Sequence, residues 1–289
     1  LLITNQIKDP EGVHTKRIMD YLESRLRGIV AYKSLVIENV YHKEPVSYDE
    51  MLAYLRKYAE IFKDYITDTG VYLTKAVNSG KKIMLEAQLG TLRDIDFGIY
   101  PYTTSSNTIA AYGPIGAGIP GVKLDVVVGV MKAYSTCVGE GPFTCEWFGE
   151  EGNALREAGG EYGAATGRPR RVGPFDAVAS RYGCRIQGAN ELALTKTDIL
   201  SYMDRIPVCV AYEIEGKRVE DFPVGKALKE AKPIYEYVKG WKCDITACRC
   251  VKDMPKELID YVHRLEELVG CRIRYVSVGA QRDAYIKMY

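Results

Sequence analysis

The stretch PFDAVASRYGCRIQGANELALTKTD, Pro174 to Asp198, sets the pattern of the fold. Its first half is typical of a helix, and NELALTKTD then indicates a buried strand that runs into a polar loop. The alternation returns near the C-terminus, where the helix-like PKELIDYVHRLEELVGC precedes the strand-like CRIRYVSVG. Helices that alternate with strands predict an α/β fold with a central, mostly parallel sheet and flanking helices. The loops that follow the strands of such a sheet carry its site.

Two further elements lie beside this pattern. IPVCVAYEIEGKRVEDFP, residues 206–223, contains two alternating runs around Glu215-Gly216 and predicts an added hairpin. Residues 152–160 predict a short helix that ends at Gly159-Gly160, because paired glycines are common just past a helix end.

The first third of the chain has mainly helical spacing. Apolar residues recur at helical intervals in 12–30 and 48–78, and Gly70 is expected to bend or split the second helix. KKIMLEA, residues 81–87, predicts a buried strand. The Gly- and Pro-rich segment 88–122 predicts irregular backbone, which in a compact domain is often functional.

The composition is that of an ordinary globular protein with balanced charge. The 289 residues include 39 Lys and Arg against 38 Asp and Glu, and 47% are hydrophobic. This length suits one large domain or two ordinary ones. A net charge of +1 argues against nucleic-acid binding, which favours a basic domain. No apolar run approaches the roughly 18–20 residues of a membrane span, so we expect neither a nucleic-acid nor a membrane partner.

The eight cysteines are scattered through apolar segments of a long chain. This distribution predicts reduced thiols in a cytoplasmic protein and no disulfide framework. Cys243, Cys248 and Cys250 cluster in CDITACRC, but the spacing is not a paired CxxC and no His is near. Tetrahedral zinc needs four ligands, so a zinc site is disfavoured.

Lys196 and Asp198 are delivered into a loop by the strand LALTKTD, residues 192–198. A carboxylate with two acceptor oxygens can take both N1–H and the exocyclic amine of guanine, a pair of donors that adenine lacks. The Lys stem can lie along the purine face. The alternative is a solvated surface turn, since K-x-D loops are common.

A second strand ends in VSVGAQRD, residues 276–283. Gly279 lets the backbone approach a flat ligand closely, because glycine has no side chain. The alternative is an ordinary strand-ending turn.

Hydroxyl groups gather in YPYTTSSNT, residues 100–108. If a helix starts here, its N-terminus and the hydroxyls favour a phosphate group. The alternative is a helix N-cap with spare hydroxyls.

Three arginines, Arg168, Arg170 and Arg171, lie within four residues of the Gly-rich stretch GEYGAATGRPRRVGPFD. The guanidinium group binds carboxylate or phosphate through two parallel hydrogen bonds, which suits a lid over a small dianion. A surface patch with local acidic partners is one alternative. A minor-groove arm built on Gly-Arg-Pro is another, but the flat charge of the chain disfavours it.

In their order along the chain, five stretches resemble the adenylosuccinate synthetase family. They are EAQLGTLRDIDFGIYPYTTSSNT, KAYSTCVGEGPF, GEYGAATGRPRRVGPFDAVA, ALTKTD with CVAYEI, and VSVGAQRD, and they run from about Lys82 to the C-terminus. The resemblance implies a P-loop-NTPase-like ligase fold and a homodimer that uses Mg²⁺. It implies a GTP-dependent ligase of purine biosynthesis that joins IMP and L-aspartate. The alternative is a guanine-nucleotide-binding fragment without catalysis.

The resemblance also assigns residues to three binding regions. The IMP-binding residues are Gln88, Thr104, Val138 and Arg168. The aspartate loop is formed by Ala164, Ala165, Thr166, Gly167, Arg168, Pro169 and Arg170. The GTP-binding residues are Arg170, Lys196, Thr197, Asp198, Ser277, Val278 and Gly279.

The chain departs from the family pattern in several places. Gln88 lies one position early, and Pro169 and Ala165 replace the Arg and Thr of many members. These residues do not include the family's Gly-Asp-Glu-Gly-Lys-Gly-Lys phosphate loop, whose Asp acts as a base and as a Mg²⁺ ligand. They also lack the family's His that helps to activate the 6-oxygen of IMP. We therefore expect neither a catalytic residue nor a metal ligand here, and we expect the 289 residues alone to be inactive.

Overall fold

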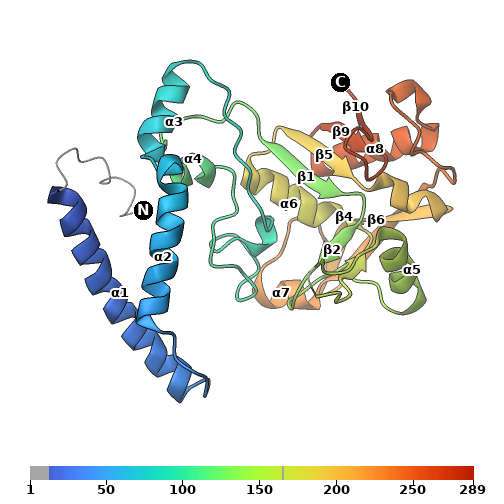
Figure 1. Ribbon diagram of the computed structural model, residues 1–289. Helices are drawn as coiled ribbons and strands as arrows, with labels where there is room; N and C mark the ends of the chain where they lie inside the picture. The colour runs from blue at the N-terminus through green and yellow to red at the C-terminus, as the bar shows by residue number, and fades with distance from the viewer. Residues whose placement is uncertain (1–12, 165) are drawn as a thin grey trace. The chain divides into compact units, whose positions relative to one another are not determined.

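The computed structural model describes residues 13–164 and 166–289. The chain forms two compact units: a helical unit, residues 1–84 with 117–120, and an α/β unit, residues 85–116 with 121–289. None of the described helices combines the length and apolar character needed to cross a membrane. The helical unit contains α1 (Val13–Asn39), α2 (Tyr48–Phe62), the 3₁₀ turn η1 (Lys63–Tyr65) and α3 (Thr69–Asn78) (Figure 1).

Both helical regions expected near the N-terminus are confirmed, with corrected boundaries. The helix expected over 12–30 continues to Asn39. The break in the second region lies before Gly70, which is the second residue of α3. Asp68 begins that helix because its carboxylate accepts a hydrogen bond from the backbone N–H of Val71 at 3.0 Å.

The strand predicted for residues 81–87 is wrong. This segment has no regular secondary structure, and Met84 is 88% exposed. A short apolar run does not distinguish a strand from an extended connector unless neighbouring strands pair with it. The irregular backbone expected over 88–122 is largely confirmed, with only η2 (Thr91–Arg93) and α4 (Tyr112–Gly116) inside it.

The α/β class is confirmed by the sheet that includes the two strands predicted first. Its order is β1 (Val128–Lys132), β5 (Glu191–Thr195), β9 (Ile273–Ser277) and β10 (Tyr285–Lys287). The β1–β5 and β5–β9 pairs are parallel, and β10 is antiparallel to β9. The C-terminal ends of β1, β5 and β9 therefore meet at one edge of the sheet.

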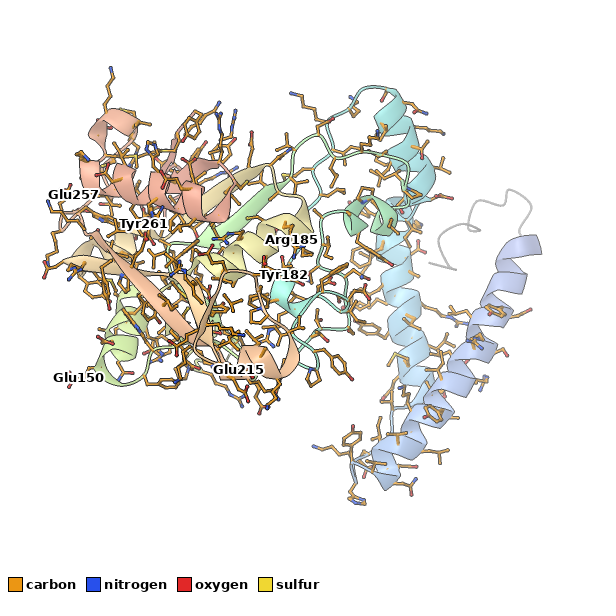
Figure 2. The ribbon with its side chains drawn as sticks, turned by 180° about the vertical axis from the view of Figure 1, so that it is seen from behind. Glu150, Tyr182, Arg185, Glu215, Glu257 and Tyr261 are labelled. Atoms are coloured by element: carbon orange, nitrogen blue, oxygen red, sulfur yellow. The ribbon has the colours of Figure 1, made fainter. Side chains whose placement is uncertain are left out.

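Helices α6 (Ala177–Gln187) and α8 (Lys256–Val269) pack against each other beside this sheet. Asp176 begins α6 by accepting from the N–H of Ala179 at 3.0 Å. Both helices end at a glycine in the left-handed conformation, as the sequence predicts for α8. Tyr261 of α8, labelled in Figure 2, is buried and donates to the carbonyl of Ala133 at 2.7 Å, just beyond β1.

A second sheet forms around the long strand β6 (Arg205–Ile214). The predicted hairpin is confirmed: β6 pairs with β7 (Lys217–Val219) through a turn at Glu215 and Gly216, both with positive φ. The helix predicted near 152–160 is also confirmed and is capped by Gly160. The remaining elements are β2 (Ser135–Cys137), α5 (Gly149–Gly159), β3 (Arg171–Gly173), β4 (Phe175–Asp176), η3 (Thr197–Tyr202), α7 (Gly225–Glu230), β8 (Lys232–Lys239) and η4 (Val251–Asp253).

Candidate functional site

Two segments singled out from the sequence lie together at the ends of β5 and β9. We call Lys196–Asp198 and Ser277–Gly279 the guanine loops, after the ligand that the sequence predicts for them. The hydroxyl of Thr197, whose side chain is fully buried, donates to the carbonyl of Ser277 at 2.6 Å. The buried Val278 donates its N–H to Ala284 at 2.9 Å, which fixes the second loop. One hydrogen bond therefore joins loops that are 80 residues apart.

Lys196 turns the chain from β5 into η3. Its φ is 62°, in the left-handed region that residues other than Gly rarely adopt, and such strain clusters at functional sites. Asp198 follows in the first turn of η3 and is half-buried. Burial raises the pKa of Asp198 above its ordinary value, although backbone N–H groups and Lys196 oppose this shift. The Asp198 carboxylate makes no hydrogen bond to another described side chain.

A pocket of about 440 Å³ opens beside the guanine loops. Thr195 and Ser277 contribute both to its wall and to the two strand ends. The flat rings of Tyr275 and Tyr285 lie 6.1 Å apart in its lining. The pocket therefore combines aromatic and hydroxyl groups next to the two loops.

The hydroxyl-rich segment 100–108 is organised by Asp94, which is fully buried. The Asp94 carboxylate accepts from the N–H groups of Asp96 at 2.9 Å, Phe97 at 3.0 Å and Thr108 at 2.6 Å. Burial alone would raise the pKa of Asp94, but these hydrogen bonds outweigh burial and lower it. No helix begins within residues 100–108, and the Asp94 carboxylate bonds the last residue of this segment, Thr108.

Arg93 connects two of the expected IMP-binding residues. Its carbonyl accepts from the N–H of Thr104 at 2.8 Å, and its guanidinium donates to the carbonyl of Val138 at 2.8 Å. The same guanidinium bonds the carbonyls of Tyr102 and Glu140. Thr104 and Val138 are thus brought together, whereas Gln88 is exposed and makes no side-chain hydrogen bond to the described residues.

The three arginines have different surroundings. Arg171 pairs with Glu146 through Nε at 2.8 Å and through Nη2, and Arg170 pairs with Glu161 at 2.9 Å. Arg168 is exposed, and its side chain has no ion pair within the described part of the chain. The alternative of local acidic partners therefore holds for two of the three arginines.

We call residues 164–170 the substrate loop, because the resemblance assigns them to aspartate; Ala165 lies outside the described residues. Ala164, Thr166, Gly167 and Pro169 are all exposed. Backbone hydrogen bonds from Gly163 to Arg168 and from Arg170 to Glu161, each 2.9 Å, close the base of the loop.

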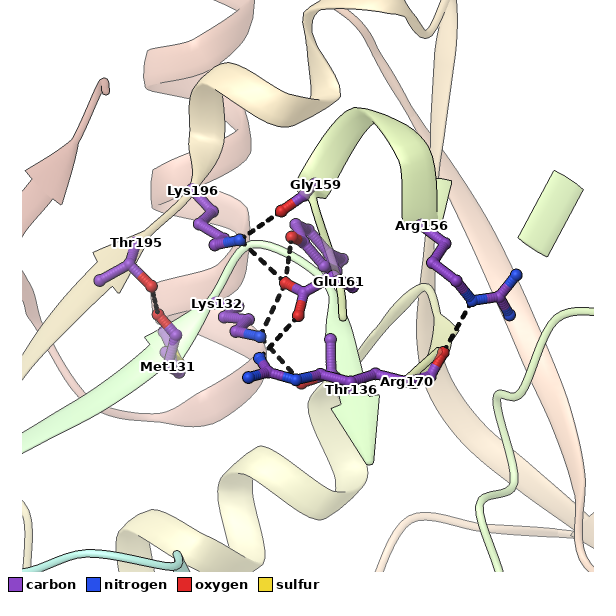
Figure 3. A network of polar contacts seen from close by, with 10 residues as sticks. Met131, Lys132, Thr136, Arg156, Gly159, Glu161, Arg170, Thr195 and Lys196 are labelled. Carbon is purple, nitrogen blue, oxygen red and sulfur yellow. Dashed lines mark hydrogen bonds and ion pairs between the residues drawn. The ribbon is translucent and has the colours of Figure 1, made fainter. Parts of the chain in front are cut away.

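Glu161 lies at the centre of a buried polar network, drawn in Figure 3. Its carboxylate is fully buried and accepts from Lys132 at 2.8 Å, Lys196 at 3.0 Å and Tyr134 at 2.6 Å, and from Arg170. Burial acts to raise the pKa of Glu161, but the hydrogen bonds from Lys132, Tyr134 and Lys196 outweigh it and lower the pKa to about 2. Glu161 is therefore a carboxylate at neutral pH.

Sequence reasoning missed Glu161, Asp94 and Arg93 as site residues. A signal existed for Glu161, which lies just before the Arg-rich loop in GEYGAATG. Its partners Lys132 and Lys196 are 29 and 35 residues away, so no local pattern identifies them. Asp94 and Arg93 act mainly on backbone groups, which leave no mark in the sequence.

The described residues contain one cluster of three side chains that could ligate a metal: Cys145, Asp176 and Cys209. All three are buried, and Asp176 also accepts from the hydroxyl of Tyr212 at 2.6 Å. Mg²⁺ prefers oxygen ligands and retains several waters, so two thiols in a dry core do not suit it. The eight cysteines are unpaired within the described residues.

The chain is similar to adenylosuccinate synthetases in both sequence and structure. The family model described as adenylosuccinate synthetase matches residues 7–286. Adenylosuccinate synthetases of Bifidobacterium adolescentis and Streptococcus gordonii are each 43% identical, over 96% and 91% of this chain. The structure of fully ligated adenylosuccinate synthetase from Plasmodium falciparum superposes with a TM-score of 0.86 at 31% identity, and the match covers 93% of this chain.

These matches cover only part of each relative. The chain spans 65% of the Bifidobacterium protein, 62% of the Streptococcus protein and 64% of the Plasmodium chain. The family model nevertheless extends over nearly all of the sequence, including both guanine loops, the substrate loop and the Glu161 network. The chain therefore belongs to the adenylosuccinate synthetase family.

Proposed function

We propose that this chain provides the guanine, IMP and aspartate subsites of a GTP-dependent ligase that forms adenylosuccinate. In this reaction the γ-phosphoryl group moves from GTP to the 6-oxygen of IMP, giving GDP and 6-phosphoryl-IMP. The amine of L-aspartate then attacks C6, and phosphate leaves with the former 6-oxygen. Phosphate is a better leaving group than a carbonyl oxygen, so the phosphoryl transfer makes the substitution feasible.

The Thr197–Ser277 hydrogen bond is the observation that carries this proposal. It holds the two guanine loops at adjoining strand ends, at 2.6 Å, where ligands of α/β sheets bind. Asp198 adds a half-buried carboxylate with no side-chain partner among the described residues, which suits the two donors of guanine.

The other subsites follow from the remaining loops. Thr104 and Val138, connected through Arg93, are assigned to IMP. Arg168 is assigned to both IMP and aspartate, because its exposed guanidinium can bind a carboxylate bidentately. Arg170, the last residue of the substrate loop, is assigned also to the GTP side; its ion pair with Glu161, which also pairs with Lys196, supports this assignment.

Mg²⁺ belongs to the reaction of the family, but the residues described here do not fit it. Their one candidate cluster contains two thiols, Cys145 and Cys209, in a buried environment.

A homodimer in the cytoplasm is also part of the proposal. The helical unit exposes large apolar side chains, among them Tyr32 at 64%, Tyr65 at 82% and Tyr72 at 65%, as expected of a surface that another chain covers. The scatter of the eight cysteines along a long chain is typical of a reducing compartment and supports this part of the proposal.

Nucleotide competition tests the central assignment. Asp198→Asn replaces an acceptor by a donor at the position assigned to guanine N1–H and its amine. We expect the variant to bind GDP at least tenfold more weakly and to gain affinity for xanthosine diphosphate, whose 2-oxo group accepts. Isothermal titration of both nucleotides against wild type measures this. An unchanged preference for GDP in the variant contradicts the placement of the guanine loops.

A further inference from the structure

We infer that Glu161 is a positioning residue that couples the guanine loops to the substrate loop. The inference rests on the proposed function, since it concerns how two proposed subsites communicate. It depends on four contacts of one buried carboxylate and on the elements from which the partners come.

The partners of Glu161 come from three separate parts of the α/β unit. Lys132 ends β1, Lys196 belongs to the first guanine loop, and Arg170 ends the substrate loop. The two oxygens divide these contacts: Oε1 accepts from both lysines and Tyr134, and Oε2 accepts from Arg170. A shift of either loop therefore changes the surroundings of the same carboxylate.

Lys196 and Arg170 are also held independently of each other. Lys196 donates to the carbonyl of Gly159 at 2.6 Å, and the backbone N–H of Arg170 bonds the Glu161 carbonyl at 2.9 Å. No hydrogen bond or ion pair joins Lys196 directly to Arg170 within the described ranges. The Glu161 carboxylate is therefore the polar group through which their side chains interact.

Three cations surround one carboxylate, so the network depends on that charge. Replacing Glu161 by Gln keeps the shape but leaves three half-buried cations without a counterion, and an uncompensated charge of this kind is costly. The amide can accept through one atom only, so it cannot bond both sides of the network. We expect the two loops to move independently in Glu161→Gln.

The test measures hydrogen exchange of the loops by mass spectrometry, with and without GDP. In the wild-type chain, GDP should slow exchange of the amides in both the guanine loops and residues 163–170. In Glu161→Gln, GDP should bind about tenfold more weakly and at saturation protect only the guanine loops. Glu157→Gln is the matched control, because this exposed carboxylate contacts Tyr162 outside the network.

A pH series separates positioning from simple loss of structure. Burial lowers the pKa of Lys132, and Glu161 opposes that effect. Without the carboxylate this pKa should fall further, so GDP affinity should begin to decline at a lower pH than in wild type. Equal weakening at every pH, with unchanged protection of residues 163–170 by GDP, overturns the inference.

Two further variants keep the inference testable if other parts fail. Arg170→Leu removes the contact between Glu161 and the substrate loop. It should also abolish the protection of residues 163–170 by GDP, and it replaces Glu161→Gln as the test if that variant does not fold. A comparison with Lys196→Met can be made without any ligand. As a single substitution, Lys196→Met should speed hydrogen exchange of residues 163–170. Added to Glu161→Gln, it should cause no further change, because the connection is already lost. If the wild-type chain does not bind GDP, the proposed function is refuted but the inference is not. The inference is then decided by the hydrogen exchange of Lys196→Met with and without Glu161→Gln.

Discussion

Thr197→Val removes the hydroxyl that joins the two guanine loops and changes little else. Valine has nearly the same shape as threonine, and Thr197 is fully buried, so packing is retained. The lost bond is the 2.6 Å contact with the carbonyl of Ser277. We expect the variant to be less stable and to bind GDP more weakly.

The magnitudes follow from the type of bond. A neutral hydrogen bond contributes ~1 kcal/mol net, and an acceptor left unpaired in a buried place costs ~1–3 kcal/mol. We therefore expect the free energy of unfolding to fall by ~1–2 kcal/mol. Release of the second guanine loop should weaken GDP binding by about tenfold, equivalent to ~1.4 kcal/mol.

Thr108→Val is the matched control. Thr108 is buried, and its hydroxyl donates to the carbonyl of Gly90 at 3.0 Å, outside the guanine loops and the pocket beside them. Urea unfolding and GDP titration are measured for both variants. The stability losses should be similar, but only Thr197→Val should lose affinity; equal affinity losses, or none, refute the reasoning.

Three more outcomes are expected. Arg168→Leu should weaken IMP and aspartate binding about tenfold and leave GDP binding unchanged, because this guanidinium is the exposed one; separate titrations with each ligand check this. The hydrogen-bonded Asp94 carboxylate has a lowered pKa, so its contribution to stability is present above the unfolded pKa of about 3.9 and is lost as pH falls through the folded value. In melting curves taken at a series of pH values from 6 downward, the melting temperature of the wild type should therefore fall more than that of Asp94→Asn. Equal falls in the two melting temperatures would contradict this. Gly173→Ala should cost ~2 kcal/mol or more, since the new Cβ meets the carbonyl of Cys145 at 1.9 Å, whereas Gly121→Ala, with open space around it, should be near neutral in the same urea assay.

The fold was predictable where a segment has both a periodic apolar pattern and a turn residue or helix-ending residue at its boundary. The strand NELALT, the hairpin at Glu215-Gly216 and the helix before Gly270 have both an apolar pattern and a turn residue at the right place. The 81–87 segment has an apolar pattern alone, and the prediction failed there. The distinction is physical, because a strand exists only if a neighbouring strand pairs with its backbone groups.

The meeting of the two guanine loops was predictable, because each loop directly follows a strand. Lys196, Asp198 and Gly279 follow strands directly, so their meeting at one sheet edge follows from parallel pairing. The central role of Glu161 could not be predicted, since its partners converge only after β1, β5 and the substrate loop are assembled. The number of charged residues is equally uninformative, because it does not show which of the three arginines forms an ion pair with a carboxylate.

The nearly balanced charge of the whole chain, +1 in total, does not reveal a local positive surplus around Glu161. Lys132, Arg170 and Lys196 carry three positive charges against one negative charge on the carboxylate. Like charges repel strongly where the dielectric constant is reduced, and the one carboxylate balances only one of the three positive charges. We expect this surplus to attract the phosphate groups of a nucleotide bound at the proposed guanine loops. Added salt should therefore weaken nucleotide binding overall, whereas the preference for guanine, which depends on the hydrogen-bond pattern at Asp198, should remain.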